Sequence, residues 1–520
     1  MKNFLSRLLE YYNLTEDQFF DLVKKPNIDE LPNISSFKEV SNAIDFIKEE
    51  ISINNKILIY GDYDCDGILS TTILYLTLKN EKFTPGFYIP FRETDGYGLT
   101  KENIDRFADL GYKDIITVDN GITLVDEIGY ARSKNINVII IDHHSLDVNL
   151  PNANFIIHPN IQKISEYNIS AGFLSFLFSY AFLGYVNEYL LTLGMITTIS
   201  DLMPLKGINR NIVQLGLEIL NKNEYPNILE LIGKNSTLPI TEIDISMSLV
   251  PKINAVGRLV SDKKLYDIVK YFVAFDDSIV VSKRSEWIEE INMYRRELVV
   301  ELTNKLKNET FDDPAIILVT ETKEGLIGLL ANRLMDLYNK PVIVFVPEKE
   351  DPSILKGSIR SKNGFDVNII QNDLKDILLS YGGHKNAGGL TLKKEDLEEF
   401  KKKFNDAARK HPFVLEDKKY IEINTSDISK ENYDLYRLFS PFGYENEAPT
   451  FVIKSFPTKS FEFSKDGKHI ITHLNFQSSL ICFNYDKKIL NKQLADLYGK
   501  FSINSFNNAI TTQFIVTNFI

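Results

Sequence analysis

Three short apolar runs of the sequence each end in acidic residues. The runs and the residues that follow them are Lys56–Tyr60 (KILIY) before Gly61–Gly67 (GDYDCDG), Asp114–Val118 (DIITV) before Asp119-Asn120-Gly121, and Val138–Ile141 (VIII) before Asp142-His143-His144. Continuous apolar runs of this length predict strands that are buried on both faces of a parallel sheet. The carboxyl ends of such strands lie at one edge, where open α/β sheets bind ligands. We therefore expect these aspartates and histidines to share one site.

A predicted helix adds a further carboxylate. The apolar run Tyr189–Ser200 predicts a helix that ends at Asp201. So many aspartates and histidines at one edge would repel one another strongly unless cations neutralised them. Oxygen ligands combined with imidazole suit Mn²⁺ or Mg²⁺ better than structural zinc. Two such ions, about 3.5–4 Å apart, would hold a phosphoryl group and activate a water molecule for in-line attack.

Each motif has a simpler interpretation when it is taken alone. Asp119-Asn120-Gly121 is typical of a turn. The segment Asp62–Asp66 is compatible with a solvated acidic loop, or with a calcium loop that lacks the downstream glutamate of an EF-hand. The interpretation as a metal site depends on the whole set, because every member follows a predicted strand or helix.

The predicted elements that position these residues alternate along the chain. Helical patterns at Ile68–Leu78 and Leu124–Ser133 separate the apolar runs, which predicts a doubly wound α/β domain. The segment Ser285–Lys307 is charged and has neither Gly nor Pro, so it predicts a rigid connecting helix. A second β-α-β pattern follows, at Ala315–Thr320, Gly325–Tyr338 and Val342–Val346.

The C-terminal part of the sequence changes character. Glycines gather at 382–389, and a charged segment, Lys401–Lys419, follows them. The remaining residues are rich in Phe, Ile and Thr, with turn signals at Asp466-Gly467 and Asn507-Asn508. This pattern predicts a small β-barrel or sandwich. We interpret its aromatic side chains, including Phe476, Phe483 and Phe506, as core residues more readily than as base-stacking platforms.

Composition excludes several classes of protein. The 520 residues include 59 basic and 71 acidic ones, a net charge of −12, which argues against a generally basic nucleic-acid coat but allows a local basic groove. Two distant cysteines, Cys65 and Cys482, indicate a reducing cytosol and no disulfide framework. The uncharged run Asn168–Asn187 approaches membrane-spanning length. Its Ser, Gly and Asn content favours a buried helix, and the residues on both of its sides are expected to share one site.

These motifs resemble a known family. GDYDCDG, DNG, DHH and Ile199–Asp201 (ISD) resemble, in order and spacing, motifs I to IV of the DHH phosphoesterases, and most closely those of the RecJ single-stranded-DNA exonucleases. Further segments that resemble RecJ proteins, their DHHA1 domain and their oligonucleotide-binding (OB) barrel are Tyr88–Thr100 (YIPFRETDGYGLT), Pro251–Leu259 (PKINAVGRL), Gly357–Ser361 (GSIRS), Tyr381–Leu390 (YGGHKNAGGL), Phe439–Pro449 (FSPFGYENEAP) and Gly499–Asn504 (GKFSIN).

The resemblance covers nearly the whole chain and implies its architecture. A doubly wound parallel-sheet DHH domain, a long connecting helix, a smaller α/β DHHA1 domain and a C-terminal OB-like β-barrel are expected. The expected boundaries are a helical lead-in at 1–55, the DHH domain at 56–280, the connecting helix at 281–312, the DHHA1 domain at 313–412 and the OB-like domain at 413–520.

The resemblance also implies a role for each motif residue. It assigns Asp64 to one metal ion, Asp66 with His143 to the other, and Asp119 with Asp201 to a bridging position. Asp62 and His144 are then expected as outer metal ligands or substrate contacts, and Asp142 is expected to orient the histidines. Tyr60 stands where the superfamily often has a histidine, which removes one possible ligand.

A second group of residues is expected to hold substrate phosphates. The resemblance places Arg258, Arg360 and His384 in this role, and arginine grips phosphate with two parallel hydrogen bonds. Weaker candidates are Asn254, Ser361 and Gly383, while Arg92 is expected to meet the nucleic-acid backbone. Outside these motifs, Arg258 would be interpreted as a surface ion-pair residue and His384 as a buried structural histidine.

The implied function is a metal-dependent 5′→3′ exonuclease that degrades single-stranded DNA to 5′-mononucleotides in DNA repair and recombination. A DNA helicase and a single-strand-binding protein are the implied partners in the cytoplasm, and no membrane is involved. The 5′ polarity comes from the resemblance alone. Two alternatives remain: a DHH phosphodiesterase for short oligoribonucleotides or cyclic dinucleotides, which needs no extra barrel, and a non-catalytic DNA-binding scaffold, which typically lacks motif aspartates that this chain retains.

Overall fold

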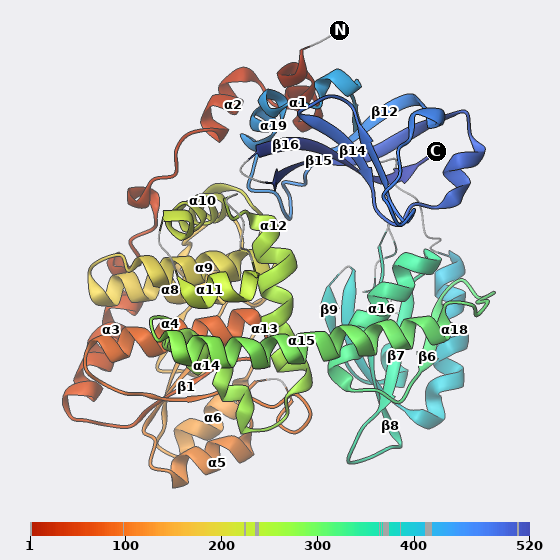
Figure 1. The fold of residues 1–520 in the computed structure, drawn as a ribbon. Coiled ribbons are helices and arrows are strands. Elements are labelled where there is room, and N and C mark those ends of the chain that lie inside the picture. The colour runs from red at the N-terminus through yellow and green to blue at the C-terminus, as the bar shows by residue number, and fades with distance from the viewer. Residues whose placement is uncertain are drawn as a thin grey trace.

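The chain forms two α/β units joined by a long helix, with a third, β-rich unit beside them (Figure 1). The computed structural model describes residues 3–96, 98–222, 225–233, 239–362, 365, 367, 374–384, 386–410, 419–506 and 509–520. The first unit holds a five-stranded sheet, the second another five-stranded sheet, and the third a six-stranded sheet.

The first sheet is parallel throughout, as predicted. Its strand order is β2-β1-β3-β4-β5. The strands are β1 (Ile57–Tyr60), β2 (Gly86–Tyr88), β3 (Asp114–Val118), β4 (Asn137–Ile141) and β5 (Phe155–Ile157). The three apolar runs form the three central strands, β1, β3 and β4. The short edge strands β2 and β5 were not predicted, because each has only three residues.

Helices cover both faces of this sheet. One hydrophobic cluster joins one face to α3 (Lys38–Ser52), α4 (Cys65–Asn80), α8 (Ala171–Leu183) and α9 (Glu188–Ser200). The opposite face packs on α5 (Lys101–Asp109) and α6 (Val125–Ser133). The uncharged run therefore forms a buried core helix, α8. Within the described ranges, no helix is both long and apolar enough to cross a membrane.

Further helices complete the first unit and lead out of it. They are α7 (Pro159–Gln162), α10 (Gly207–Lys222), α11 (Pro226–Ile232), α12 (Glu242–Asp244), α13 (Val250–Leu259) and α14 (Tyr266–Val273). The connecting helix α15 spans Ser278–Leu306 and runs from the first unit to the second (Figure 1). It begins seven residues before the predicted Ser285, capped by the Asp277 carboxylate, which accepts hydrogen bonds from the Ile279 and Val280 amides.

The second unit has a mixed sheet of order β6-β7-β8-β10-β9, in which only β6 and β7 are parallel. Its elements are β6 (Ile316–Val319), α16 (Glu324–Tyr338), β7 (Val342–Pro347), β8 (Ile354–Arg360), β9 (Leu378–His384), β10 (Ala387–Lys393) and α18 (Leu397–Lys410). The sheet also contains the glycines that gather at 382–389. They lie in the paired strands β9 and β10, where they let the backbones approach closely: a Cβ at Gly383 would lie 2.5 Å from the Gly388 Cα.

The third unit is a six-stranded sheet of order β11-β12-β15-β16-β14-β13. Its elements are β11 (Tyr420–Glu422), α19 (Lys430–Arg437), β12 (Thr450–Pro457), β13 (Ile470–His473), β14 (Ser478–Cys482), β15 (Leu494–Phe506) and β16 (Ala509–Phe519). Gly467 has a φ of +67°, as the predicted turn requires. The other predicted turn, Asn507-Asn508, lies outside the described residues.

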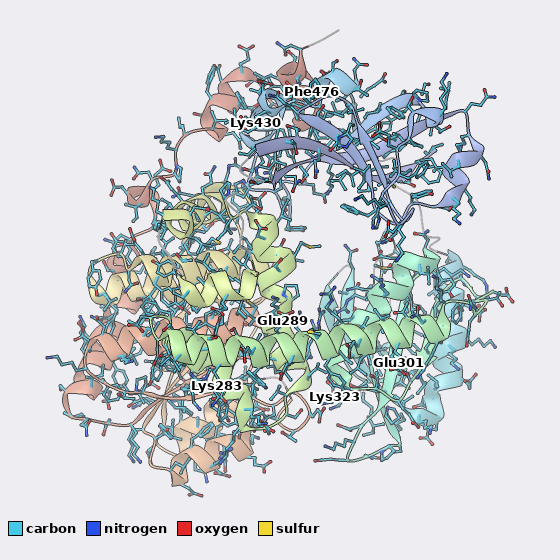
Figure 2. The ribbon with its side chains drawn as sticks, viewed as in Figure 1. Lys283, Glu289, Glu301, Lys323, Lys430 and Phe476 are labelled. Carbon is cyan, nitrogen blue, oxygen red and sulfur yellow. The ribbon has the colours of Figure 1, made fainter. Side chains whose placement is uncertain are left out.

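The prediction that the aromatic residues Phe476 and Phe483 are core residues was wrong. Phe476 is fully exposed and Phe483 is 58% exposed, because one lies in the β13–β14 connection and the other directly after β14. Phe476 projects on the outer side of the third unit, far from the second unit (Figure 2). The side chain of Phe506 lies outside the described residues. The core of this unit includes instead Phe451, Phe501 and Phe514.

The N-terminal segment is divided between two units. Helices α1 (Phe4–Tyr12) and α2 (Glu16–Leu22) pack on the third unit, whereas α3 packs on the first (Figure 1). The ring of Phe4 stacks on Phe451 at 5.9 Å, and the Tyr12 hydroxyl donates to the Glu447 carbonyl at 2.8 Å. The expected single lead-in therefore contains two separate structural parts.

Candidate active site

The loop between β1 and α4 carries the first carboxylates. Asp64 caps α4, accepting a hydrogen bond from the Gly67 amide at 3.1 Å. A Cβ at Gly67 would lie 2.5 Å from the Asp62 nitrogen, so only glycine allows this close turn. Asp66 is buried, and its two oxygens accept hydrogen bonds from the Ala171 and Gly172 amides at 2.8 and 2.7 Å. The N-terminus of α8 thus holds the Asp66 carboxylate in place.

The end of β3 brings Asp119 to the same edge through a strained turn. Asp119 has a φ of +61°, a backbone conformation that residues other than Gly, Asn and Asp rarely adopt. Gly121 follows with a φ of +116°. The side-chain amide of Asn120 donates hydrogen bonds to the carbonyls of Gly61 at 3.1 Å and Val118 at 2.8 Å. These hydrogen bonds tie the turn after β3 to the turn after β1.

The end of β4 supplies the two histidines. Asp142 Oδ1 accepts hydrogen bonds from the amides of His143 and His144 at 2.7 and 3.2 Å and lies 2.7 Å from His144 Nδ1. Its Oδ2 accepts from the Ile122 amide at 3.0 Å. The buried His158 reaches the His144 carbonyl with Nε2 at 2.8 Å. Asp142 and His158 thereby fix the backbone at both histidines, and no sequence motif indicated this role of His158.

The structure brings the predicted ligands together around His143. Its Nε2 lies 3.3 Å from Asp119 Oδ1, 3.5 Å from Asp201 Oδ2 and 3.8 Å from Asp66 Oδ2. Asp201 reaches this point from the C-terminal end of α9. Possible ligand atoms lie within 4.8 Å of one another in three overlapping groups of three residues. Together these groups form what we call the carboxylate cluster: Asp62, Asp64, Asp66, Asp119, His143, His144 and Asp201.

The carboxylate cluster carries uncompensated negative charge. Burial and the Asp64 charge raise the pKa of Asp62 to about 7, and the same two causes raise the pKa of Asp201 to about 7. Burial and neighbouring carboxylates raise the pKa values of Asp66 and Asp119 well above the ordinary value for aspartate. Within the described residues, Asp62 Oδ1 is buried and has no hydrogen-bond partner. These features are those expected of a cation site.

The two histidines differ in charge. Burial and the neighbouring His144 lower the pKa of His143 to about 3, so its ring is neutral and able to bind a metal ion. Burial also disfavours the charged form of His144, but the hydrogen bond that His144 donates to Asp142 and the charge of Asp142 outweigh this effect and raise the pKa of His144 to about 9. The donor set of carboxylate oxygens with neutral imidazole fits Mn²⁺ or Mg²⁺.

Tyr60 has a structural role here. Its ring is fully buried and stacks on Tyr88 at 5.5 Å. Its hydroxyl donates to the Gly98 carbonyl at 2.7 Å. The tyrosine at this position therefore stabilises the loop after β2.

Arginines from two units meet in a cavity of about 340 Å³, which we call the arginine pocket. It is lined by Arg92, Arg258 and Arg360 together with residues of α16, β8 and β10. Arg258 donates to the Gly325 carbonyl at 2.9 Å, and Arg360 donates to the Ser358 hydroxyl at 2.9 Å. Burial and the charges of Arg92 and Arg360 lower the pKa of Arg258 to about 10. This concentration of positive charge is suited to an anion such as phosphate.

The arginine pocket is adjacent to the loop that carries the first carboxylates. The guanidinium of Arg92 lies 3.9 Å from the centre of the Tyr63 ring. Asn254, one turn before Arg258 on α13, accepts a hydrogen bond from the Cys65 amide at 2.8 Å. A Cβ at Gly257 would lie 1.7 Å from the Tyr63 carbonyl oxygen. The helix that carries Arg258 therefore packs directly on the carboxylate loop.

The other predicted phosphate contacts are less closely associated with this pocket. Ser361 is buried, and its amide donates to the Asn386 carbonyl at 2.8 Å. Gly383 is exposed on β9 and pairs with Gly388. Among the described residues, neither Ser361 nor Gly383 lines the arginine pocket. His384 ends β9, and its side chain lies outside the described residues.

Sequence reasoning missed a fourth arginine. Arg295 lies on α15, donates to the Asn292 side chain at 2.9 Å, and has a buried Nε without a partner in the described part of the chain. Its charge is among those that lower the pKa of Arg258. No motif marks Arg295, because its position near Arg258 depends on how α15 packs across α13 and α16.

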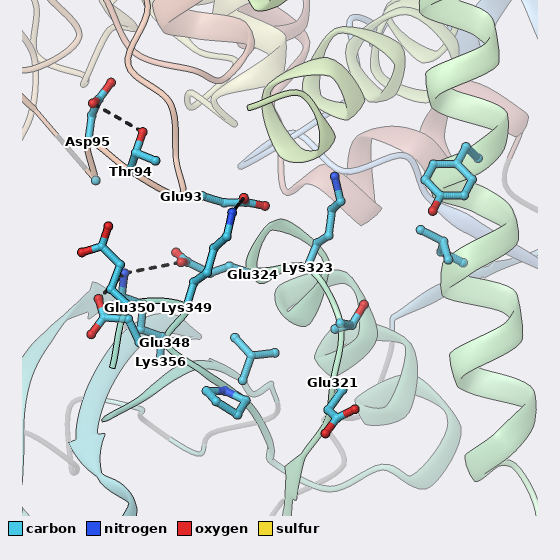
Figure 3. Close-up of a pocket in the computed structure, with 16 residues that line it drawn as sticks. Glu93, Thr94, Asp95, Glu321, Lys323, Glu324, Glu348, Lys349, Glu350 and Lys356 are labelled. Atoms are coloured by element: carbon cyan, nitrogen blue, oxygen red, sulfur yellow. Dashed lines mark hydrogen bonds and ion pairs between the residues drawn. The ribbon is translucent and has the colours of Figure 1, made fainter. Parts of the chain in front are cut away.

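A larger cavity, of about 830 Å³, shares Glu324 with the arginine pocket, because this residue lines both (Figure 3). Its acidic residues include Glu93, which pairs with Lys349 across the two units at 3.7 Å. Lys356 pairs with Glu348 at 3.0 Å. Lys323, at the cap of α16, donates to the Leu259 carbonyl at 2.9 Å and so joins α13 to the second unit.

Three family models match separate parts of the chain. The N-terminal domain of the DHH family matches residues 56–200, the DHHA1 domain 310–410, and the RecJ OB domain 421–518. A relative from Bacillus subtilis (strain 168), named single-stranded-DNA-specific exonuclease RecJ, is 31% identical over 500 residues, covering 92% of this chain. The chain belongs to the RecJ family. It spans 63% of the length of that Bacillus RecJ protein, less than two thirds.

Solved structures of RecJ proteins share this fold. RecJ from Thermus thermophilus, crystallised in complex with Mn²⁺, is 21% identical with a TM-score of 0.83, and the match covers 99% of this chain and 76% of that chain. A second structure, of exonuclease RecJ bound to manganese, is 25% identical with a TM-score of 0.61 and covers 72% of this chain and 96% of that one.

Proposed function

We propose that this chain is a metal-dependent exonuclease that hydrolyses single-stranded DNA from its 5′ end to 5′-mononucleotides. The observation that carries the proposal is the carboxylate cluster in one unit, packed against an arginine pocket built largely by another. Such a pair can bind cations and phosphate side by side. The names of RecJ relatives, which specify single-stranded DNA, support the choice of substrate.

Two Mn²⁺ or Mg²⁺ ions are the proposed cofactors, and the relatives crystallised with these ions support this choice. When bound, such ions polarise the phosphoryl oxygens and make water a better nucleophile at neutral pH. Asp64 would hold one ion and Asp66 with His143 the other, while Asp119 and Asp201 would contribute to the binding of both. The distances of 3.3–3.8 Å from His143 to three of these carboxylates suit shared coordination after small adjustments.

The remaining residues orient the substrate. Asp142 orients His144 within the carboxylate cluster, where His144 and Asp62 are suited to contact the substrate or to support the inner ligands. Arg258 and Arg360 would grip phosphates, since guanidinium groups make two parallel hydrogen bonds to them, and Arg92 would neutralise the backbone. We include Asn254, Ser361, Gly383 and His384 as secondary contributors to this phosphate site.

The third unit favours a long substrate over the alternatives. A phosphodiesterase for short oligoribonucleotides or cyclic dinucleotides has no use for a RecJ OB domain at residues 421–518. A non-catalytic scaffold has no need for an intact carboxylate cluster. We further propose a cytoplasmic role in repair and recombination, with a DNA helicase and a single-strand-binding protein as partners. The two buried free cysteines agree with a reducing compartment.

The proposal is tested by a comparison of substrates. Purified chain is incubated with long single-stranded DNA, the matching duplex and a four-nucleotide oligomer, each with Mn²⁺ or EDTA, and released mononucleotides are separated. We expect Mn²⁺-dependent release from the long single strand and little from the duplex. Cleavage of the short oligomer alone would favour the phosphodiesterase, and DNA binding without cleavage would favour the scaffold.

A further inference from the structure

The loop that carries Asp201 contains a strained reversal of the chain. After α9 ends, Leu202 has a φ of +52°, a left-handed backbone conformation that residues other than glycine adopt at an energetic cost. The amides of Leu202 and Met203 donate to the carbonyls of Ile199 at 3.3 Å and Thr198 at 3.1 Å. A strained turn persists only where surrounding contacts hold it. The segment after Asp201 therefore needs support from its neighbours.

That support comes from the third unit. We call Arg437–Asn446 the docking segment. The Leu205 amide donates to the Tyr444 carbonyl at 3.0 Å. The ammonium of the next residue, Lys206, lies 2.8 Å from the Glu445 carboxylate. The docking segment thus contacts the chain four and five residues after Asp201.

Two further side chains of the first unit anchor the docking segment. Glu242 is 1% exposed and accepts two parallel hydrogen bonds from Arg437, at 2.8 and 2.9 Å, and a third from the Phe442 amide at 3.2 Å. Arg210, on α10, donates to the carbonyls of Phe439 and Ser440. Removing one partner of a buried bidentate ion pair is costly, so the Arg437–Glu242 pair holds the docking segment in a fixed position on the first unit.

Packing makes the contact rigid from both sides. The side-chain amide of Asn446 donates hydrogen bonds to the carbonyls of Phe439 and Pro441 at 2.9 and 2.7 Å. These bonds connect the two ends of the docking segment. A Cβ at Gly443 would lie 2.7 Å from Cδ1 of the buried Leu205, so the Gly443 backbone packs directly on the Leu205 side chain. In the first unit, the side-chain amide of Asn209 donates a hydrogen bond to the Pro204 carbonyl at 3.0 Å.

We propose that the docking segment positions Asp201. It holds residues 202–206 in the arrangement that directs the Asp201 carboxylate at the carboxylate cluster, so that docking of the third unit raises the metal affinity of the first. Its residues act through Asp201 and need not touch the substrate. The inference rests on the proposed metal-dependent activity, and it assigns the third unit a role in addition to DNA binding.

A charge swap across the contact tests this inference. Lys206 and Glu445 are partly exposed, so their reversal leaves the buried anchors intact. We compare Lys206→Glu, Glu445→Lys and the double variant in the full chain. Each single variant is expected to weaken Mn²⁺ binding three- to fivefold by isothermal titration calorimetry and to lower kcat by a similar factor, with KM for DNA unchanged. The double variant is expected to recover wild-type Mn²⁺ affinity within twofold.

Lys222→Glu is the matched control, because it reverses an exposed ion-paired lysine at the far end of α10. It is expected to leave Mn²⁺ affinity unchanged. Unchanged Mn²⁺ affinity in both single variants would overturn the inference, as would a double variant as impaired as the single ones. A rise in KM alone would also overturn it and assign the contact to DNA binding. Because calorimetry needs no DNA, a chain that binds Mn²⁺ as expected but has no nuclease activity would refute the proposed function only.

Discussion

The carboxylate cluster and the arginine pocket are adjacent, but their charges are balanced in different ways. Backbone amides satisfy part of the carboxylate cluster, at Asp66, yet the pKa values of its aspartates remain raised. In the arginine pocket, by contrast, neutral acceptors such as the Gly325 carbonyl and the Ser358 hydroxyl take up guanidinium hydrogens. Neutral groups satisfy hydrogen bonds in both regions but cancel no charge, so the cluster needs added cations and the pocket an anion such as phosphate.

The two regions also differ in how the chain forms them. The carboxylate cluster is built at the ends of consecutive strands and one helix of a single unit. The arginine pocket collects Arg92, Arg258 and Arg360 from segments that meet only when two units are joined. We therefore expect changes in the cluster to affect metal binding and the chemical step, and changes in the pocket to affect substrate affinity.

The largest effect is expected for Asp119→Asn. Asparagine tolerates the positive φ of this position, so the turn should survive. Loss of this proposed bridging carboxylate should lower kcat by about 10³-fold, equivalent to several kcal/mol of charge stabilisation. The Mn²⁺-induced rise in melting temperature should disappear, while the melting temperature in EDTA should stay the same or rise because a buried charge is removed. A lower melting temperature in EDTA would contradict this view of the cluster.

Arg258→Lys should have an intermediate effect. Lysine keeps the positive charge but loses the planar fork that grips phosphate. We expect KM for single-stranded DNA to rise about tenfold, which corresponds to about 1.4 kcal/mol, with a smaller change in kcat. Steady-state kinetics on a labelled strand measures both. The Mn²⁺-induced rise in melting temperature should equal that of the wild type; if it is lost, the two regions are not separable.

The central part of this site could be predicted from the sequence because it follows local rules. The strands β1, β3 and β4 were visible as apolar runs, and parallel strands bring the residues after them to one edge. The end of α9 at Asp201 was predicted for the same reason, since an apolar helical run stops there. These patterns depend on residues close in sequence and needed no knowledge of how the units pack.

Features that depend on long-range packing could not be predicted. Helices α1 and α2 belong with the third unit, more than 400 residues further along the chain, and no local pattern marks that partnership. The same limit applies to Arg295, whose place near Arg258 depends on the path of α15. Phe476 was misassigned because an exposed aromatic and a buried one look alike in a β-rich sequence.

A smaller effect is expected for Asn254→Ala, at the contact between the two regions. Its side chain accepts the hydrogen bond from the Cys65 amide, beside Asp64 and Asp66. Loss of this acceptor leaves a backbone amide unsatisfied, which costs about 1–3 kcal/mol. We expect both Mn²⁺ affinity and KM to worsen by about fivefold, measured by calorimetry and steady-state kinetics. A change in only one of them would mean that Asn254 serves a single region.

The smallest effect is expected for Phe476→Ala. The exposed ring lies on the outer side of the third unit, away from the second unit (Figure 2). Removal of a base-stacking residue costs about 1–3 kcal/mol, so a stacking role would raise the Kd for single-stranded DNA at least fivefold. We expect a change below twofold in fluorescence anisotropy. A larger loss would extend the DNA path around the third unit.

One measurement tests the central claim most directly. Long single-stranded DNA with a 5′-³²P label is incubated with the chain and Mn²⁺, beside the Asp119→Asn variant, and the products are separated over time. We predict that labelled mononucleotide appears at the earliest times and that the variant releases it about 10³-fold more slowly. A ladder of labelled strands that shorten gradually would show attack from the 3′ end, and equal release by wild type and variant would show that the carboxylate cluster is not the active site.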